Sequence, residues 1–152
     1  MTMVEALAAA AARAGYEIFW LGAASPGEID RLETLVGITL PESFRDFLAR
    51  HGGGGIVDAE ISGIENDDAA RATGGTVWGD TQACRTRFGL PDGLAVVYFH
   101  DDETCWAIDG RGETRPVVSY NLPLRRIDRE IAPDFEAFLR LHLGLYAEAA
   151  AD

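Results

Sequence analysis

SPGEIDRLETLVGITLPESFRDFLARHGGGG, residues 25–55, is the stretch that predicts the fold. Its first half begins with Ser25 followed by Pro26, and Glu28 stands three residues after the serine. This spacing is typical of a capping box at a helix start. Gly37 is suited to the left-handed residue that ends a helix. The residues between them place apolar side chains on one helical stripe, at Ile29, at Leu32 and at either Leu35 or Val36.

The second half of the stretch predicts another short helix. Pro41 is favourable at a helix start, and the charge of Glu42 suits the dipole there. Gly52 is expected to end the helix. The buried face of this helix is predicted to hold Phe44, Phe47 and Leu48.

Four glycines, residues 52–55, close the stretch after His51. An HGGG sequence resembles the oxyanion motif of some esterases, but that motif requires a G-x-S-x-G nucleophile elbow, which this chain lacks. No Lys-Ser/Thr pair follows the glycines, as a phosphate-binding loop would need. We therefore interpret them as a helix end leading into a strand, which alternation predicts at residues 57–62.

The remaining pattern predicts an α+β protein with a mainly antiparallel sheet and four to five helices. Helices are expected at residues 4–13, at residues 77–88 and from Pro133 onward, with a frayed tail over residues 147–152. Strands are expected at residues 94–99 and 104–108, which form a hairpin, and at residues 116–120. We expect one domain over residues 1–152, made of a lead-in (1–24), a core (25–143) and a tail (144–152).

The chain is strongly acidic, with 25 Asp and Glu against 13 Arg, no Lys, and a formal net charge of −12. This balance argues against nucleic acid as a partner, because phosphate binding requires clustered cations. It permits a basic protein partner. No apolar run is long enough to cross a membrane, and the N-terminus is a poor signal peptide, so we expect a cytoplasmic protein with no membrane partner. Its oligomeric state is left open.

The side chains that most often do chemistry form no motif here. The two cysteines, Cys84 and Cys105, are interpreted as buried reduced thiols, although their spacing leaves a disulfide open. The histidines at positions 51, 100 and 142 show no metal-ligand spacing. The most metal-like cluster, residues 100–103, is better explained as a solvated hairpin turn, since it lacks the pattern of an EF-hand. We therefore predict no catalytic residue, no cofactor and no metal.

The motifs of the opening stretch, and several that follow it, resemble the SUKH superfamily in its Smi/Knr-like branch. The matching pieces are Ile29, Leu32 and Glu33, then GITLP (37–41), FRDFL (44–48), GG (52–53), LPDGL (90–94) with its strand (95–99), CWAID (105–109), PVV (116–118) and FEAFL (135–139). The resemblance covers residues 25–143. The Ala-rich N-terminal helix lies outside it, and the turn at residues 101–103 is shorter than the acidic loop of many members.

The resemblance implies an α+β fold and a non-enzymatic role. Bacterial members look like immunity proteins, which bind a toxin domain, often a nuclease, and protect the producing cell. Fungal relatives act as scaffolds in cell-wall synthesis and signalling. The first function we expect is therefore an immunity protein that binds a basic toxin. The alternatives are a regulatory scaffold and, third, an enzyme with an unrecognised site.

Acidic residues near strand ends and turns are the predicted partner-binding positions, because a field of one sign speeds encounter with a partner of the opposite sign. Buried aromatic residues usually dominate interface energy. An exposed Trp20 or Trp106 would thus be a stronger anchor, although both are expected in the core. The acidic candidates are Asp58, Glu60, Glu65, Asp67, Asp68, Asp101, Asp102 and Glu103.

Overall fold

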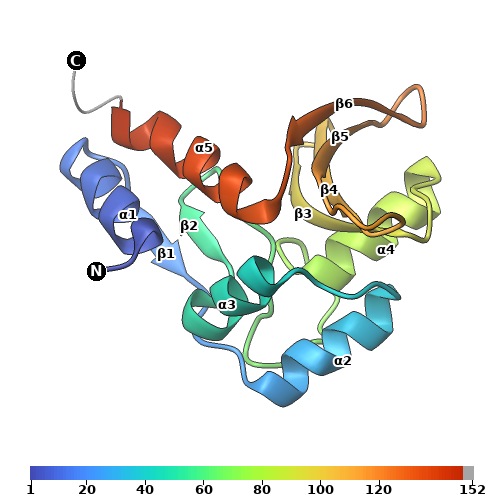
Figure 1. The fold of residues 1–152 in the computed structure, drawn as a ribbon, viewed down its shortest axis with the longest axis horizontal. Coiled ribbons are helices and arrows are strands. Elements are labelled where there is room, and N and C mark those ends of the chain that lie inside the picture. The colour runs from blue at the N-terminus through green and yellow to red at the C-terminus, as the bar shows by residue number, and fades with distance from the viewer. Residues whose placement is uncertain (149–152) are drawn as a thin grey trace.

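A four-stranded antiparallel sheet, with strands in the order β3-β4-β5-β6, forms one end of the computed structural model (Figure 1). Its strands are β3 (Leu94–His100), β4 (Thr104–Asp109), β5 (Val117–Asn121) and β6 (Arg126–Ala132). The helix α4 (Val77–Phe88) lies along it. The structure describes residues 1–148. The predicted α+β class and antiparallel hairpins are confirmed.

The strand β3 is covered on both faces of the sheet. In β3, Leu94 and Val96 belong to the apolar cluster beneath α4, whereas Ala95 and Val97 belong to the main core. A strand covered on both sides needs an apolar run rather than strict alternation, which explains its sequence. The cluster beneath α4 also holds both cysteines, whose thiols are buried and unbridged with the sulfur atoms 3.7 Å apart.

The last strand, β6, was not predicted. Its sequence RIDREIA is dominated by charged residues, and most of its side chains are exposed. It pairs only with β5, so it forms an edge of the sheet. Charged side chains are common on edge strands, because they discourage pairing with other chains, but they hide the strand from a search for apolar alternation.

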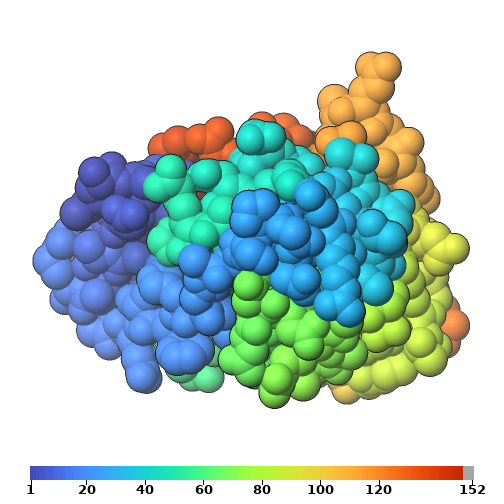
Figure 2. Space-filling view, turned by 90° about the horizontal axis from the view of Figure 1, so that it is seen from below, coloured from blue at the N-terminus to red at the C-terminus, as the bar shows by residue number. Residues whose placement is uncertain are grey.

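The helices α2 (Pro26–Val36) and α3 (Glu42–His51) form where the opening stretch predicts them. The capping box of α2 is only half made. The Ser25 hydroxyl accepts the Glu28 N–H, but the Glu28 carboxylate accepts the N–H of Ala69 (2.9 Å) instead of the Ser25 N–H. The Ser25 N–H donates to Asp67 (2.8 Å). A loop distant in sequence thus completes the cap, and it lies against α2 in Figure 2.

The predicted strand at residues 57–62 is wrong. The short strand β2 (Gly54–Ile56) instead runs through the glycines and pairs with β1 (Ile18–Trp20). Residues 57–60 then form a turn in which Asp58 has φ +72°, and Ile61 bridges back to Gly54. The missing side chains explain this course: a Cβ added at Gly52 would lie 1.8 Å from the Gly22 carbonyl oxygen, and one at Gly63 would lie 1.8 Å from that of Gly52.

The first and last helices, α1 (Met3–Arg13) and α5 (Phe135–Glu148), lie side by side at the other end of the molecule (Figure 1). Thr2 and Glu5 form a full capping box on α1. On α5 the cap is Asp134, whose carboxylate accepts the Ala137 N–H, and not Pro133 as expected. The predicted fraying from Ala147 is wrong as far as Glu148, and residues 149–152 lie outside the described residues. Within residues 1–148, no helix is long and apolar enough to cross a membrane.

Candidate partner-binding cleft

Four of the eight predicted acidic positions already serve the chain's own contacts. Asp67 caps α2, and Asp68 pairs with Arg31 (3.3 Å). Glu65 accepts the Thr73 hydroxyl and lies 3.7 Å from Arg71. Asp102 pairs with Arg87 (2.7 Å), and this hydrogen bond holds the pKa of Asp102 below its usual range. These four carboxylates hold turns and loops in place.

The other four candidates make no ion pair within residues 1–148. Asp58, Asp101 and Glu103 are exposed in turns, and Glu60 is half-buried. The structure brings Glu60 and Glu65 to one depression, described below as the small cleft. Trp20 and Trp106 are half-buried and pack against the main core, as expected.

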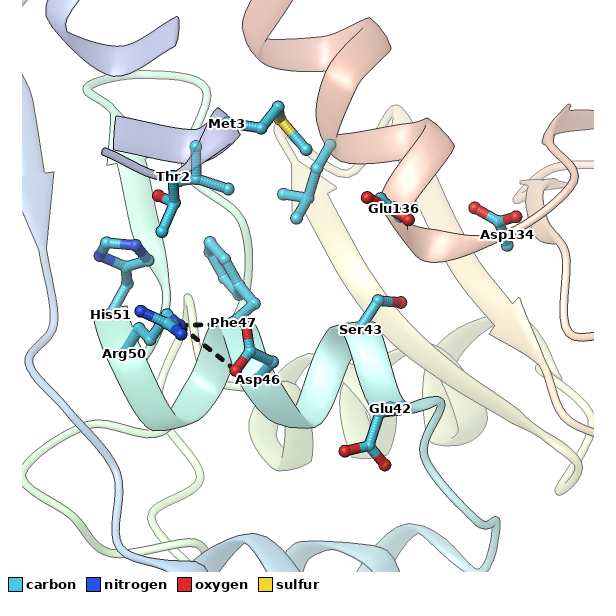
Figure 3. Close-up of a pocket in the computed structure, with 12 residues that line it drawn as sticks. Thr2, Met3, Glu42, Ser43, Asp46, Phe47, Arg50, His51, Asp134 and Glu136 are labelled. Carbon is cyan, nitrogen blue, oxygen red and sulfur yellow. Dashed lines mark hydrogen bonds and ion pairs between the residues drawn. The ribbon is translucent and has the colours of Figure 1, made fainter. Parts of the chain in front are cut away.

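A larger depression was missed by the sequence reasoning. The main cleft, of about 620 Å³, lies between the start of α1, one face of α3 and the start of α5 (Figure 3). Its polar lining holds four carboxylates and one guanidinium, from Glu42, Asp46, Asp134, Glu136 and Arg50. Three of these acids stand at helix starts, where the sequence explains them as dipole partners. Nothing in the sequence indicates that three helices bring them together.

The floor of the main cleft is apolar. Phe47 and Leu139 form part of it and are only 2% and 3% exposed, because both also belong to the main core. Met3 and Val4, at the start of α1, are half-buried beside them. In Figure 3 the labelled side chains of Met3, Phe47 and Glu136 border the same space. The cleft thus combines an apolar floor with an acidic rim.

The acids of the rim differ in whether they already have hydrogen-bond or ion-pair partners within the chain. Asp46 pairs with Arg50 on the next turn of α3 (3.1 Å), and Asp134 caps α5. Glu136 lies 3.9 Å from Arg140, and both side chains are well exposed. Within residues 1–148 the Glu42 carboxylate has no hydrogen-bond or ion-pair partner. Glu42 and Glu136 therefore keep most of their accepting capacity for a partner from outside.

His51, for which the sequence indicated no ligand role, lines one end of the main cleft. The residue is 9% exposed, and its ring lies 4.3 Å from the Trp20 ring. Burial lowers the pKa of His51, so the imidazole is neutral at pH 7. No group within residues 1–148 hydrogen-bonds its buried Nε2 atom. A buried polar atom without a partner is uncommon in folded proteins and calls for an explanation.

The small cleft, of about 330 Å³, lies between β1, the 60–75 segment and the end of β3, and it contains a buried acid. Asp80, on the first turn of α4, accepts the Ser62 hydroxyl (2.6 Å) and the Gly75 N–H (3.2 Å). Burial outweighs these hydrogen bonds and raises its pKa to about 6. His100 also lines this cleft, but its Nε2–H donates to the Glu60 carbonyl (3.0 Å). Ser62, Asp80 and Gly75 together hold the loop to the helix.

The described residues offer no other evident chemical centre. Among residues 1–148 there is no group of three or more His, Cys, Asp or Glu side chains that could hold a metal ion. His142 lies within α5 and its Nε2–H donates to the Ala59 carbonyl (2.9 Å), which is a structural contact. The main cleft, with its apolar floor and acidic rim, is the candidate site.

A comparison with protein families agrees with this fold. The family model described as SMI1-KNR4 cell-wall, SUKH_5, matches residues 3–143. The chain belongs to this SUKH family. The match takes in α1 and β1 as well, so the N-terminal helix that the sequence motifs left outside the resemblance is part of the family region. No curated protein matches the chain.

Proposed function

We propose that this SUKH protein is a non-enzymatic immunity protein that acts in the cytoplasm and neutralises a basic toxin domain by binding it directly. The observation that carries the proposal is the main cleft, where four carboxylates and one guanidinium surround an apolar floor. The net charge of −12 supports it, because a strong field of one sign raises the rate of encounter with a partner of the opposite sign. A nuclease domain, being basic, is the kind of toxin that fits.

The test is to express each gene that flanks this one in a sensitive host, alone and together with this chain. We expect one product to stop growth and this chain to restore it. The pair should form a stable complex whose association rate falls steeply as salt rises, because exposed charges are screened over about 8–10 Å at physiological salt. The proposal fails if no flanking product is toxic, or if a toxic one is not relieved.

The same assay separates a binding protein from an enzyme. A binding protein protects only up to its own molar amount, so residual toxin activity should fall linearly and reach zero near one equivalent. An enzyme that destroys the toxin would protect at a small fraction of an equivalent, given time. Residual toxin activity is measured after mixing the purified proteins at several molar ratios below and above one equivalent.

A regulatory role in the cell wall is the second candidate, favoured by the cell-wall description of the matching family. It predicts that loss of the gene alters sensitivity to wall-active agents even where the flanking genes are deleted too. Under the immunity proposal, deleting the toxin gene together with this one should leave growth unchanged.

A further inference from the structure

We propose that the main cleft is an arginine pocket, which binds one arginine side chain of the protein partner. The aliphatic stem of this arginine packs on the apolar floor, and its guanidinium lies beside the acidic rim. The inference deepens the proposed binding function and rests on it for the identity of the occupant as a protein side chain. It adds which face of the molecule docks and what chemistry the partner must present.

The floor fits the stem of such a side chain. Arginine carries an apolar stem and a charged head, and it commonly buries the stem while the head stays among polar groups. Met3, Val4, Phe47 and Leu139 supply an apolar surface for the stem. The aromatic ring of Phe47 is held in place by the main core, so the surface is present before the partner arrives.

The rim fits the head. Glu42 and Glu136 stand in the first turns of two different helices, and both are exposed. Arg50 is the single guanidinium in the lining and is paired with Asp46. Outside the lining, Glu136 has one loose, exposed pairing with Arg140 (3.9 Å), and Glu42 attracts Arg45 without forming an ion pair. A guanidinium has five N–H donors in a planar fork and can bind carboxylates with two parallel hydrogen bonds. An anionic group would be repelled by the same carboxylates.

His51 gives the independent reason to expect a ligand here. Its Nε2 atom is buried in the lining and unpartnered within residues 1–148. Because burial keeps the ring neutral, one ring nitrogen is free to accept a hydrogen bond. The groups that face this ring, Glu5, Asp46 and Arg50, leave it uncharged at pH 7. With the ring proton on Nδ1 the Nε2 atom is an acceptor, and a donor-only head such as guanidinium satisfies it once the side chains that cover it move aside.

The cleft can be probed without a partner in hand. N-acetyl-argininamide is titrated into the isotope-labelled protein, followed by NMR at the methyl groups of Met3 and Leu139 and the ring of His51. N-acetyl-citrullinamide, which has nearly the same shape but no charge, is the matched probe. We expect saturable shifts with the arginine probe, confined to the main cleft, and binding at least about fivefold weaker with the citrulline probe. Equal binding of both probes, or no binding, overturns the proposal.

Variants separate a built pocket from general attraction to an acidic protein. Glu42→Gln combined with Glu136→Gln removes two rim charges and should weaken the arginine probe about fivefold. Glu17→Gln combined with Glu113→Gln removes two exposed charges from loops that do not line the cleft and are not predicted partner-binding positions. This control should bind as the unaltered protein does. An equal loss in both double variants would show diffuse electrostatics and would overturn the arginine pocket.

The titration with the arginine probe and the growth assay test different claims, so one can fail while the other succeeds. A cleft that binds the arginine probe while no flanking product is toxic keeps the pocket and rejects the immunity role. A toxin that is neutralised equally well by the protein and by the Glu42→Gln/Glu136→Gln variant, with unchanged affinity, overturns the assignment of the pocket to the partner. Weakened neutralisation by this variant alone, with the Glu17→Gln/Glu113→Gln control unaffected, supports both.

Discussion

The two clefts of this molecule use their acidic residues in opposite ways. In the small cleft the Asp80 carboxylate is 3% exposed, and the Ser62 hydroxyl and the Gly75 N–H both donate to it. In the main cleft Glu42 and Glu136 are exposed on the rim. The first carboxylate is enclosed by donors from its own chain, whereas the other two are exposed at the edge of the cleft.

This difference shows which acids in an acidic protein are free to recognise a partner. A carboxylate that accepts hydrogen bonds from groups of its own chain contributes to the fold, and a partner could use it only by breaking those bonds. Asp67 and Asp102 belong to this kind, although sequence position alone makes them resemble recognition residues. Free accepting capacity above an apolar floor is therefore a better guide than charge.

The largest expected effect tests whether the small cleft is part of the fold. A Cβ at Gly63 would lie 1.8 Å from the Gly52 carbonyl oxygen, which is backbone and has no room to move. Gly63→Ala should therefore lower the free energy of unfolding by more than about 3 kcal/mol, or leave no folded protein. Urea denaturation followed by circular dichroism measures the loss.

Gly74→Ala is the matched control, because Gly74 lines the small cleft, which Gly63 adjoins next to Ser62, but has no atom within 4 Å of an added Cβ. Its backbone also lies outside the left-handed region. Alanine there should be neutral or stabilise by up to about 1 kcal/mol, since it restricts the unfolded chain. Similar stability of the two variants would show that the segments around Gly52 and Gly63 do not cross as closely as the structure indicates.

The second prediction concerns the ionisation of Asp80. Its pKa is raised from 3.8 to about 6 in the folded state, so the folded chain holds its proton over a pH range where the unfolded chain has lost it. This contribution to stability is fully present below pH 3.8 and is lost as pH rises through about 6. The loss from acid to neutral pH is on the order of 3 kcal/mol.

Asp80→Asn tests the contribution of Asp80 to this pH dependence. An amide oxygen can still accept the Gly75 N–H, and the amide N–H can donate to the Ser62 hydroxyl, but asparagine does not titrate. The unaltered protein should therefore lose stability relative to Asp80→Asn between pH 4 and pH 7.5. Urea titrations at four pH values measure this difference. A difference that stays constant with pH would show that Asp80 is ionised throughout.

Local signals in the sequence were enough to predict the helices and much of the sheet. The caps at Ser25 and Gly37 and the apolar run at residues 94–99 are each read within a few residues, and the structure confirms them. The strand expected at residues 57–62 failed because its alternation comes from a turn, in which Asp58 takes a left-handed backbone. Alternation of side chains does not distinguish a strand from a turn whose apolar residues are buried separately.

Local sequence patterns could not predict the candidate site, for a different reason. Its lining comes from residues near position 3, residues 42–51 and residues 134–139, which only the packed helices bring together. The half-made capping box shows the same limit, since Glu28 and Ser25 find their partners in a distant loop. A sequence indicates which groups need a hydrogen-bond partner, but the tertiary fold decides which partner each one receives.

The third prediction separates an acid's hydrogen bond from its backbone conformation. Asp67 and Asp101 have similar left-handed φ angles, +50° and +58°, but only Asp67 accepts a hydrogen bond from a distant residue, the Ser25 N–H. Alanine is strained in a left-handed backbone, so both substitutions carry this cost and it cancels in the comparison. Asp67→Ala should cost about 1 kcal/mol more than Asp101→Ala, which is the usual net value of one hydrogen bond. Equal losses of unfolding free energy in urea denaturation would show that the Asp67 carboxylate does not contribute to the fold.

The smallest expected effect on stability falls on the rim of the main cleft. Glu136→Gln loses a favourable contact with the α5 dipole and a loose pairing with Arg140, whose nearest atoms are 3.9 Å apart. Both groups are exposed, so the free energy of unfolding should fall by about 0.5 kcal/mol or less. The same change should weaken the arginine probe measurably. A stability loss as large as that of Asp67→Ala would place Glu136 among the structural carboxylates, and the distinction between the two clefts would fail at the residue on which the docking argument most depends.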